Sequence, residues 1–324
     1  MSKNGKVTDP HLLEARDTDI VIPIMGATGA GKSSFINRYL SGIGMGEPVQ
    51  VGDALLSCTV HIQSIVVENQ VSSKFPHLPR ETRIVIVDTP GFDDTIASDF
   101  EILKRIANWL QESYRKNMVL GGVIYLHDIS QDRFSGTARR NLEMFNHLCG
   151  DAALSKVVLV TSKWGRAYDR DFSKREEELK QVHWKKMLNP GKNGEKGAKV
   201  MRLDHTNEQG SARKVVESIL KRVDRAAGEN LVQESLQIQE ELVSRRKFLP
   251  DTNAGLELKH QLQAMIDAQT QMLALEAEAA KGDPEAEKQL REAEEKVRLL
   301  AEQVRKLKVP IIKRIGRWMG FGRG

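Results

Sequence analysis

Apolar runs and helix-periodic stretches alternate along the first two thirds of the chain. Short runs rich in Val, Ile and Leu predict strands at 20–25, 60–67, 83–87, 119–126, 157–161 and 199–203. Between the later runs, apolar residues recur at helical spacing over 99–116, 135–149, 171–188 and 211–227. This alternation predicts a mostly parallel sheet with crossover helices. The runs at 60–67 and 83–87 predict a hairpin that adds one antiparallel edge.

After residue 228 the pattern becomes helical, rich in Ala, Leu, Glu, Gln, Lys and Arg as far as residue 308. It is interrupted at 248–255 and at 281–285, where Gly282 ends one helix and Asp283 and Pro284 start another. Two long helices joined there would fold as a hairpin. The last helix carries a coiled-coil-like seam of Leu290, Ala293, Val297, Leu300, Val304 and Leu307. The seam is short, so packing within the chain and oligomerisation both remain open.

Composition limits the class of protein. With 324 residues the chain has room for one α/β domain and an additional segment. Cys58 and Cys149 are isolated, which argues against a disulfide framework or a zinc site and fits a reducing compartment. The first twenty residues lack an apolar signal core, and no run is long enough to span a membrane. We therefore expect a cytoplasmic protein.

Charge singles out the C-terminal end. The net charge of +5 is too small and too evenly spread to predict nucleic-acid binding, but residues 305–324 hold seven Lys or Arg and no acid. There, Ile311, Ile315 and Trp318 share one helical face and the basic residues lie away from it. This pattern predicts peripheral contact with an anionic membrane or an acidic partner, and a disordered or self-docked tail is the alternative. The predicted organisation is a flexible tail at 1–18, an α/β domain at 19–228, a helical arm at 229–308 and a basic amphipathic tail at 309–324.

The run GATGAGKSS directly follows the first predicted strand and has the spacing of a phosphate-binding loop, GxxxxGK[ST]. Glycines let the backbone curl around an anion, Lys32 is expected to reach the β- and γ-phosphates, and Ser33 is expected to bind Mg²⁺. The sequence therefore predicts a P-loop NTPase three-layer fold with a helical C-terminal extension. The residues expected to contact the nucleotide here are Gly26, Ala27, Thr28, Gly29, Ala30, Gly31, Lys32, Ser33 and Ser34.

A second motif, DTPGF at 88–92, follows the strand RIVIV. Asp88 is expected to hold Mg²⁺ through water, and the Gly91 N–H is expected to meet the γ-phosphate, where a side chain would block the approach. Between the two motifs a switch segment should supply a hydroxyl ligand to Mg²⁺. Thr59 is the first candidate and Ser57 the alternative. With Lys32 and Gly91, Thr59 completes the predicted catalytic set.

The recognition of the base is less clearly encoded. GTPases use [NT]KxD after the corresponding strand, and this chain has TSKWGR there. One register starts at Thr161 and puts Trp164 in place of the Asp, whereas the other puts Lys163 in the Lys position and Gly165 in place of the Asp. Neither register supplies a carboxylate. Trp164 would then pack in the core or stack on a purine. We expect base contacts from Thr161, Ser162, Lys163 and Trp164, with Asn207 as a weaker candidate.

Several stretches resemble the fungal G-domain-containing proteins, relatives of the septin, immunity-associated and chloroplast-import-receptor GTPases. They are GATGAGKSSFIN, SCT, DTPGFDDT, YLHDISQDR, RRNLEMFNHLCGD and VTSKWG, and the resemblance covers residues 19–225. It implies a GTP- and Mg²⁺-dependent switch in which a Trp commonly replaces the base-reading Asp. It also implies weak hydrolysis that depends on a second protomer or a partner. A homodimer through the G domains or the C-terminal helices is the expected form of self-association. An ATPase and a nucleotide-binding scaffold without turnover are the rival interpretations.

The catalytic Gln of Ras-type enzymes has no counterpart, because Phe92 occupies its place. Asp93 and Asp94 are candidates for positioning water, although acidic residues in such a loop are usually only solvated. Candidates for a charge-stabilising Arg across a dimer interface are Arg133, Arg139 and Arg140. We expect His127 to be a packed residue.

Overall fold

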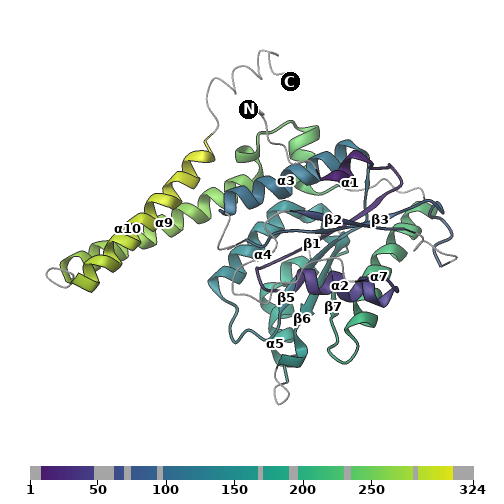
Figure 1. The fold of residues 1–324 in the computed structure, drawn as a ribbon, viewed down its shortest axis with the longest axis horizontal. Helices are drawn as coiled ribbons and strands as arrows, with labels where there is room; N and C mark the ends of the chain where they lie inside the picture. The colour runs from purple at the N-terminus through teal and green to yellow at the C-terminus, as the bar shows by residue number, and fades with distance from the viewer. Residues whose placement is uncertain are drawn as a thin grey trace, which may run out of the picture.

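A computed structural model of the chain describes residues 9–46, 62–68, 74–92, 98–166, 171–189, 196–229, 235–279 and 284–308. Within these residues one sheet has the strand order β2-β3-β1-β5-β6-β7, and β4 pairs with β1 beside β5 (Figure 1). The strands are β1 (Ile20–Gly26), β2 (Gln63–Val67), β3 (Ile84–Asp88), β4 (Val119–Leu120), β5 (Val123–Asp128), β6 (Val157–Ser162) and β7 (Lys199–Arg202). The predicted mostly parallel sheet is confirmed, and β2 is its antiparallel edge.

The strand predicted at 119–126 is in fact two strands, β4 and β5, separated by Gly121 and Gly122. A Cβ on Gly121 would lie 2.4 Å from the Cγ2 of Ile20, and one on Gly122 would lie 2.7 Å from the carbonyl oxygen of Lys156. The backbone therefore runs too close to its neighbours to carry side chains. β5 starts after this crowded point.

Helices cover both faces of the sheet (Figure 1). α2 (Lys32–Gly42) and α7 (Glu208–Gly228) bury Phe35, Leu40 and Ile219 against one face. α3 (Asp99–Arg115) and α4 (Gly136–Cys149) pack on the other face, and η1 (Asp151–Lys156) leads from α4 into β6. These three layers confirm the predicted fold class.

Two predicted helices have different boundaries in the structure. The stretch 171–188 is divided into α5 (Ser173–Glu178), the π-helical turn η3 (Leu179–His183) and α6 (Lys185–Leu188), with Trp184 fully buried at the last break. α7 begins at Glu208 rather than at residue 211, because the Asn207 side chain accepts a 2.9 Å hydrogen bond from the Gly210 N–H and caps the helix. Asn207 thus has a structural role.

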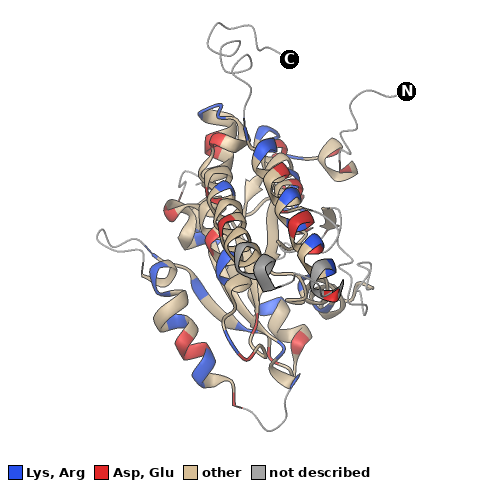
Figure 2. Ribbon diagram, turned by 90° about the vertical axis from the view of Figure 1, so that its left-hand side faces the viewer, with Lys and Arg blue, Asp and Glu red and all other residues tan. Residues whose placement is uncertain are grey.

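The C-terminal region is helical, as predicted. It comprises α8 (Gln237–Gln239), η4 (Glu240–Ser244), η5 (Leu249–Asp251), α9 (Asn253–Ala279) and α10 (Pro284–Lys306). α10 runs back along α9, and of the seam residues Leu300 and Leu307 are buried (Figure 1). These two residues therefore pack within the chain. Figure 2, which faces the tip of this hairpin, shows basic and acidic residues interspersed along both helices.

The beginning of this helical region is part of the core of the α/β domain. Leu236 and Ile238 are fully buried in the same cluster as the apolar residues of α3 and α4, and Leu258 of α9 joins them. At the other end of the chain, α1 (Pro10–Leu13) buries Leu12 in this cluster, and Asp9 accepts a 3.1 Å hydrogen bond from the Trp109 indole. Segments on both sides of the predicted 19–228 domain thus contribute to its core.

No helix among the described residues is long and apolar enough to cross a membrane. The amphipathic tail at 309–324 lies outside the described residues. Its membrane contact stays a prediction.

The shared core predicts that α9 stabilises the α/β domain. Leu258→Ala, at a residue only 1% exposed, should lower the free energy of unfolding by about 2–5 kcal/mol in urea titrations followed by circular dichroism. Leu256→Ala is the matched control, because Leu256 lies on the same helix and is 53% exposed. It should change the free energy by less than about 0.5 kcal/mol. Equal effects of the two substitutions would show that the first turns of α9 do not belong to the core.

Candidate functional site

The loop between β1 and α2 has the backbone that a phosphate-binding loop requires. Gly26, Gly29 and Gly31 have φ angles of 142°, 77° and 94°, a region that L-residues rarely adopt. A Cβ on Gly26 would also lie 2.4 Å from the carbonyl oxygen of Leu126 in β5. The glycines of the motif are therefore required by conformation and, at Gly26, by space as well.

Lys32 and Ser33 begin α2 directly behind this loop. The Lys32 side chain is buried, and its Nζ donates to the carbonyl oxygens of Gly26 (3.0 Å) and Ala27 (3.1 Å), so the ammonium lies inside the loop. The Ser33 hydroxyl donates a 2.6 Å hydrogen bond to Oδ2 of Asp88, which is fully buried at the end of β3. The structure thus joins the two predicted Mg²⁺ ligands of the described residues. A hydroxyl and a carboxylate are oxygen ligands of the kind that Mg²⁺ prefers.

The DTPG turn packs directly on the phosphate loop. A Cβ on Gly91 would lie 2.4 Å from the backbone nitrogen of Thr28 and 2.7 Å from its Oγ1, so only glycine fits. The Thr28 hydroxyl is buried and makes no hydrogen bond within the described residues. A buried polar atom of this kind is normally satisfied, and a phosphate oxygen is a suitable acceptor. The cradle therefore fits a bound phosphate.

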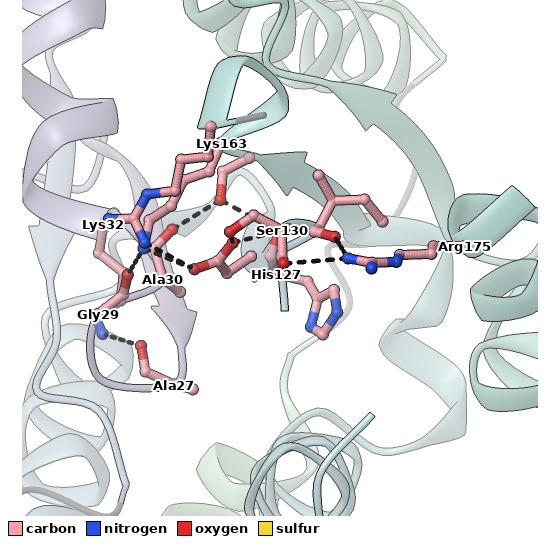
Figure 3. Close-up of polar contacts among 12 residues, drawn as sticks. Ala27, Gly29, Ala30, Lys32, His127, Ser130, Lys163 and Arg175 are labelled. Carbon is pink, nitrogen blue, oxygen red and sulfur yellow. Dashed lines mark hydrogen bonds and ion pairs between the residues drawn. The ribbon is translucent and has the colours of Figure 1, made fainter. Parts of the chain in front are cut away.

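The loop after β6 contacts the phosphate loop from the other side (Figure 3). The Ser162 hydroxyl donates to the carbonyl oxygen of Ala30 at 2.8 Å. The Lys163 ammonium donates to the carbonyl oxygen of Gly29 and, at 2.7 Å, to Oδ2 of Asp128. Lys163 has a φ of 64°, a left-handed conformation that costs a non-glycine residue about 1 kcal/mol. These bonds hold the residue in this strained conformation.

Asp128 ends β5 and is the main acidic partner of this loop. Burial alone would raise the pKa of Asp128, but hydrogen bonds from Lys163 and Ser130 outweigh burial and hold this pKa below its usual range. The carboxylate is therefore charged at neutral pH and fixes the Lys163 ammonium against the phosphate loop.

These contacts favour one of the two registers for the base-reading motif. Lys163 occupies the Lys position, because its ammonium reaches the phosphate loop, and Ser162 then stands first in the motif. The position of the Asp falls on Gly165. The other register, with Trp164 in that position, does not agree with these contacts.

Trp164 begins a short 3₁₀ turn, η2 (Trp164–Arg166), and its ring is held by side chains of the domain. The indole N–H donates to the Thr161 hydroxyl at 3.0 Å, and this hydroxyl donates to Oε1 of Glu176 at 3.2 Å. The Arg202 guanidinium bonds to Glu176 at 2.5 Å and lies 4.3 Å from the centre of the indole ring. The four side chains form a closed circuit. Of the two interpretations of Trp164, the structure therefore favours packing.

Glu176, Arg202 and Asp128 are contributors that the sequence analysis missed. An acid at the end of an apolar strand, as in YLHD, is a signal that would have identified Asp128. Glu176 and Arg202 lie in α5 and β7 and meet only in the fold. Arg175 is a further residue that the sequence analysis missed. Its guanidinium donates to the carbonyl oxygen of Ser130 at 3.1 Å (Figure 3). It also donates to the carbonyl oxygen of Gln131 at 2.9 Å and so orders the loop after β5.

Other predicted residues lie elsewhere. Thr59, Ser57, Asp93 and Asp94 fall outside the described residues. Ser34 is in the first turn of α2, Arg133 is exposed in the loop before α4, and Arg139 and Arg140 belong to α4.

His127 is packed in the structure, as expected from the sequence. Its ring lies 5.6 Å from Phe134 and 5.9 Å from Trp184. Burial, with a smaller contribution from His183, lowers the pKa of His127 to about 4 against the opposing effect of Asp128. The imidazole is therefore neutral at physiological pH.

The match to a family model agrees with this geometry. Residues 21–163 match the family model described as 50S ribosome-binding GTPase. Similar solved structures include Toc33 from Arabidopsis thaliana with GDP and Mg²⁺, at 14% identity over 68% of this chain and 88% of that chain (TM-score 0.47). Another is the GTPase-like domain of S. cerevisiae Ski7, at 14% identity over 69% of this chain and 53% of that chain (TM-score 0.43). No curated protein matches the chain.

The fold, the phosphate loop and the family match define the class of protein. The described residues have the fold of a P-loop GTPase, and residues 21–163 match a GTPase family model. The narrower resemblance to fungal, septin-like and immunity-associated proteins stays a prediction.

The circuit around Trp164 predicts a pH-dependent contribution to stability. Burial alone would raise the pKa of Glu176, but hydrogen bonds from Arg202 and Lys180 lower this pKa below its ordinary value. Because the pKa of Glu176 is lowered in the folded state, the contribution of its charge to stability is complete above the ordinary Glu pKa of about 4.3. This contribution is lost as the pH falls through the folded-state pKa. Glu176→Gln should therefore lower the free energy of unfolding by about 1–2 kcal/mol at pH 7, and the difference should shrink below about pH 4.

Urea unfolding at pH 7 and at a pH below about 4 measures how much the substitution lowers the free energy of unfolding. Glu177→Gln, at the adjacent exposed residue, is the control and should change little at either pH. A Glu176→Gln deficit that stays constant on acidification would show that the side chain acts through packing and not through its charge.

Proposed function

We propose that this protein is a guanine-nucleotide-binding molecular switch that hydrolyses GTP slowly and requires Mg²⁺. The main observation behind the proposal is that the phosphate-loop motif and the DTPG motif are in direct contact. Ser33 is hydrogen-bonded to Asp88 at 2.6 Å, and Gly91 packs on the backbone of Thr28. In this proposal the Gly91 N–H meets the γ-phosphate, and the segment that follows β3 senses whether that phosphate is present.

Each residue has a definite part in this proposal. Lys32 would contact the β- and γ-phosphates from within the loop, where its ammonium already lies. Ser33 would bind Mg²⁺ directly and Asp88 would hold it through water. The bound ion would neutralise charge on the phosphates, and Thr59 would complete its ligands in the triphosphate state.

Slow turnover follows from Phe92, which stands where Ras-type enzymes have the water-orienting Gln. Its side chain packs against the core and lines a small cavity with Ile106 and Phe145. A hydrocarbon ring cannot orient water, so a catalytic group would come from a partner or a second protomer. Arg133, exposed on the loop before α4, is our first candidate for this group, with Arg139 and Arg140 as the others.

The helical arm is suited to transmit the state of the site. The Gln261 side chain of α9 donates to the carbonyl oxygen of Arg140 at 3.3 Å, and Glu257 of α9 lies 3.4 Å from the His147 ring of α4. α4 also lines the cavity next to Phe92. A rearrangement of the DTPG turn would therefore reach α9 through α4.

The first test is the identity of the bound nucleotide. We expect mass spectrometry of the purified protein to detect GDP or GTP, and titrations to show that chelation of Mg²⁺ weakens GTP binding by about tenfold or more. Ser33→Ala should bind GTP weakly with or without Mg²⁺. Ser41→Ala, near the other end of α2, is the control and should behave as wild type. Preferential binding of ATP would favour the ATPase interpretation.

The second test concerns hydrolysis. The rate per molecule should rise with protein concentration, because a second protomer supplies the missing group. Arg133→Ala should remove this rise. Arg213→Ala should keep it, because Arg213 is an exposed residue of α7, which covers the face of the sheet opposite to α4. A rate that stays high and constant on dilution would contradict self-stimulation. Bound GTP that remains intact in single-turnover experiments would instead favour the scaffold without turnover.

A further inference from the structure

Gly165 leaves the Asp position of the base-reading motif without a side chain, and His205 stands next to it. A Cβ on Gly165 would lie 3.1 Å from the Cβ of His205, 3.3 Å from its Cδ2 and 3.4 Å from its Cγ. His205 follows β7, so two neighbouring loops at the same edge of the sheet meet at this point. The imidazole thus lies beside the place where the missing carboxylate would begin.

This place is on the side of the site where a nucleoside would lie. Asp88 and Gly91, at the γ-phosphate and Mg²⁺ end, follow β3 on one side of β1. β5, β6 and β7 lie on the other side of β1. A nucleotide held by the phosphate loop must therefore extend its base toward the loops after β6 and β7, where Gly165 and His205 meet.

The His205 ring is free to bind. Its side chain is 49% exposed, and neither ring nitrogen makes a hydrogen bond to any residue that the structure describes. Its nearest acidic group is Asp204, whose Oδ1 lies 3.9 Å from Nδ1. Hydrogen bonds from the backbone and side chain of Thr206 lower the pKa of Asp204, so this carboxylate is charged at neutral pH.

The surroundings hold both loops in place. On the β6 side, Lys163 is bonded to the phosphate loop and the Trp164 indole is bonded to Thr161. On the β7 side, Asn207 caps α7 and the Ser211 hydroxyl donates to the carbonyl oxygen of Asn207 at 2.8 Å. Gly165 and His205 are therefore presented by ordered segments. Such preorganisation favours binding.

We propose that His205 recognises the guanine base in place of the carboxylate that the motif lacks, an inference that rests on the proposed function. With Nδ1–H directed toward the negative Asp204, Nε2 is the hydrogen-bond acceptor and accepts from N1–H of guanine. Adenine has no hydrogen at N1 and is rejected. Because one ring nitrogen accepts a single hydrogen bond, the 2-amino group is not recognised, and hypoxanthine binds as well as guanine.

Equilibrium titrations of the full chain with GDP, IDP and ADP test this assignment. Wild-type protein should bind GDP and IDP alike and ADP about tenfold or more weakly. His205→Ala should weaken GDP and IDP binding by about tenfold and leave ADP binding unchanged. His77→Ala is the matched control, because His77 is also an exposed histidine beside an aspartate, 3.2 Å from Asp224. It should leave all three affinities unchanged.

A gain-of-function variant provides a second test of the assignment. In His205→Ala with Gly165→Asp, the carboxylate regains its usual place. The contacts of the new Cβ with Cδ2 and Cγ of the imidazole are removed, and the 3.1 Å contact with the Cβ of residue 205 remains. Because a carboxylate accepts from both N1–H and the 2-amino group, this variant should recover GDP binding and prefer GDP over IDP by about tenfold.

The outcomes separate this inference from the proposed function. If His205→Ala keeps the wild-type ratio of GDP to ADP affinity, the assignment to His205 is overturned while the nucleotide site stands. Wild-type binding of GDP and ADP with equal affinity also overturns it, because no residue then selects the base. If wild-type protein binds none of the three nucleotides, the proposed function fails together with the inference.

Discussion

The close approach of two backbone segments is the constraint on which the site depends. β1 and β3 pair in parallel, with Ile24 beside Asp88, so the loops that follow them leave the sheet at the same height. The turn after β3 then packs on the phosphate loop, and no Cβ fits at Gly91. Any movement of this turn must displace the phosphate loop or move away from it. A phosphate held in this loop would therefore also be sensed by this turn.

The base side of the site is built by a different kind of interaction. Here side chains fix the loops through a circuit in which Thr161, Glu176 and Arg202 surround the Trp164 ring, and Thr161 and Glu176 are its buried members. The acid of the circuit is used for structure and not for recognition, since its oxygens accept from Arg202 and Lys180. A domain that keeps the phosphate machinery can therefore change its base-reading residues without losing the geometry of this loop.

The strands and the conformation of the phosphate loop could be predicted from the sequence because both depend on local signals. Apolar runs marked the strands, and fixed spacing placed Lys32, Ser33 and Asp88. The register after β6 could not be chosen, because the choice depends on whether the Lys163 ammonium reaches Gly29 in space. The broken strand at Gly121 and the break at Trp184 also escaped, since both result from tertiary crowding or burial. Contacts between distant segments, such as that of His205 with Gly165, have no signature in spacing.

The helical arm is an integral part of the domain, and this too depends on tertiary contacts and not on local sequence signals. Periodicity marked 229–308 as helical, but it did not indicate that Leu236, Ile238 and Leu258 complete the core beneath α3 and α4. An arm attached by a flexible linker would be insensitive to the site, because the linker would absorb any displacement. Here α9 is held to α4 by buried apolar contacts and by Gln261 and Glu257. Since packed interfaces move as units, a shift of α4 must be carried along α9 into the hairpin.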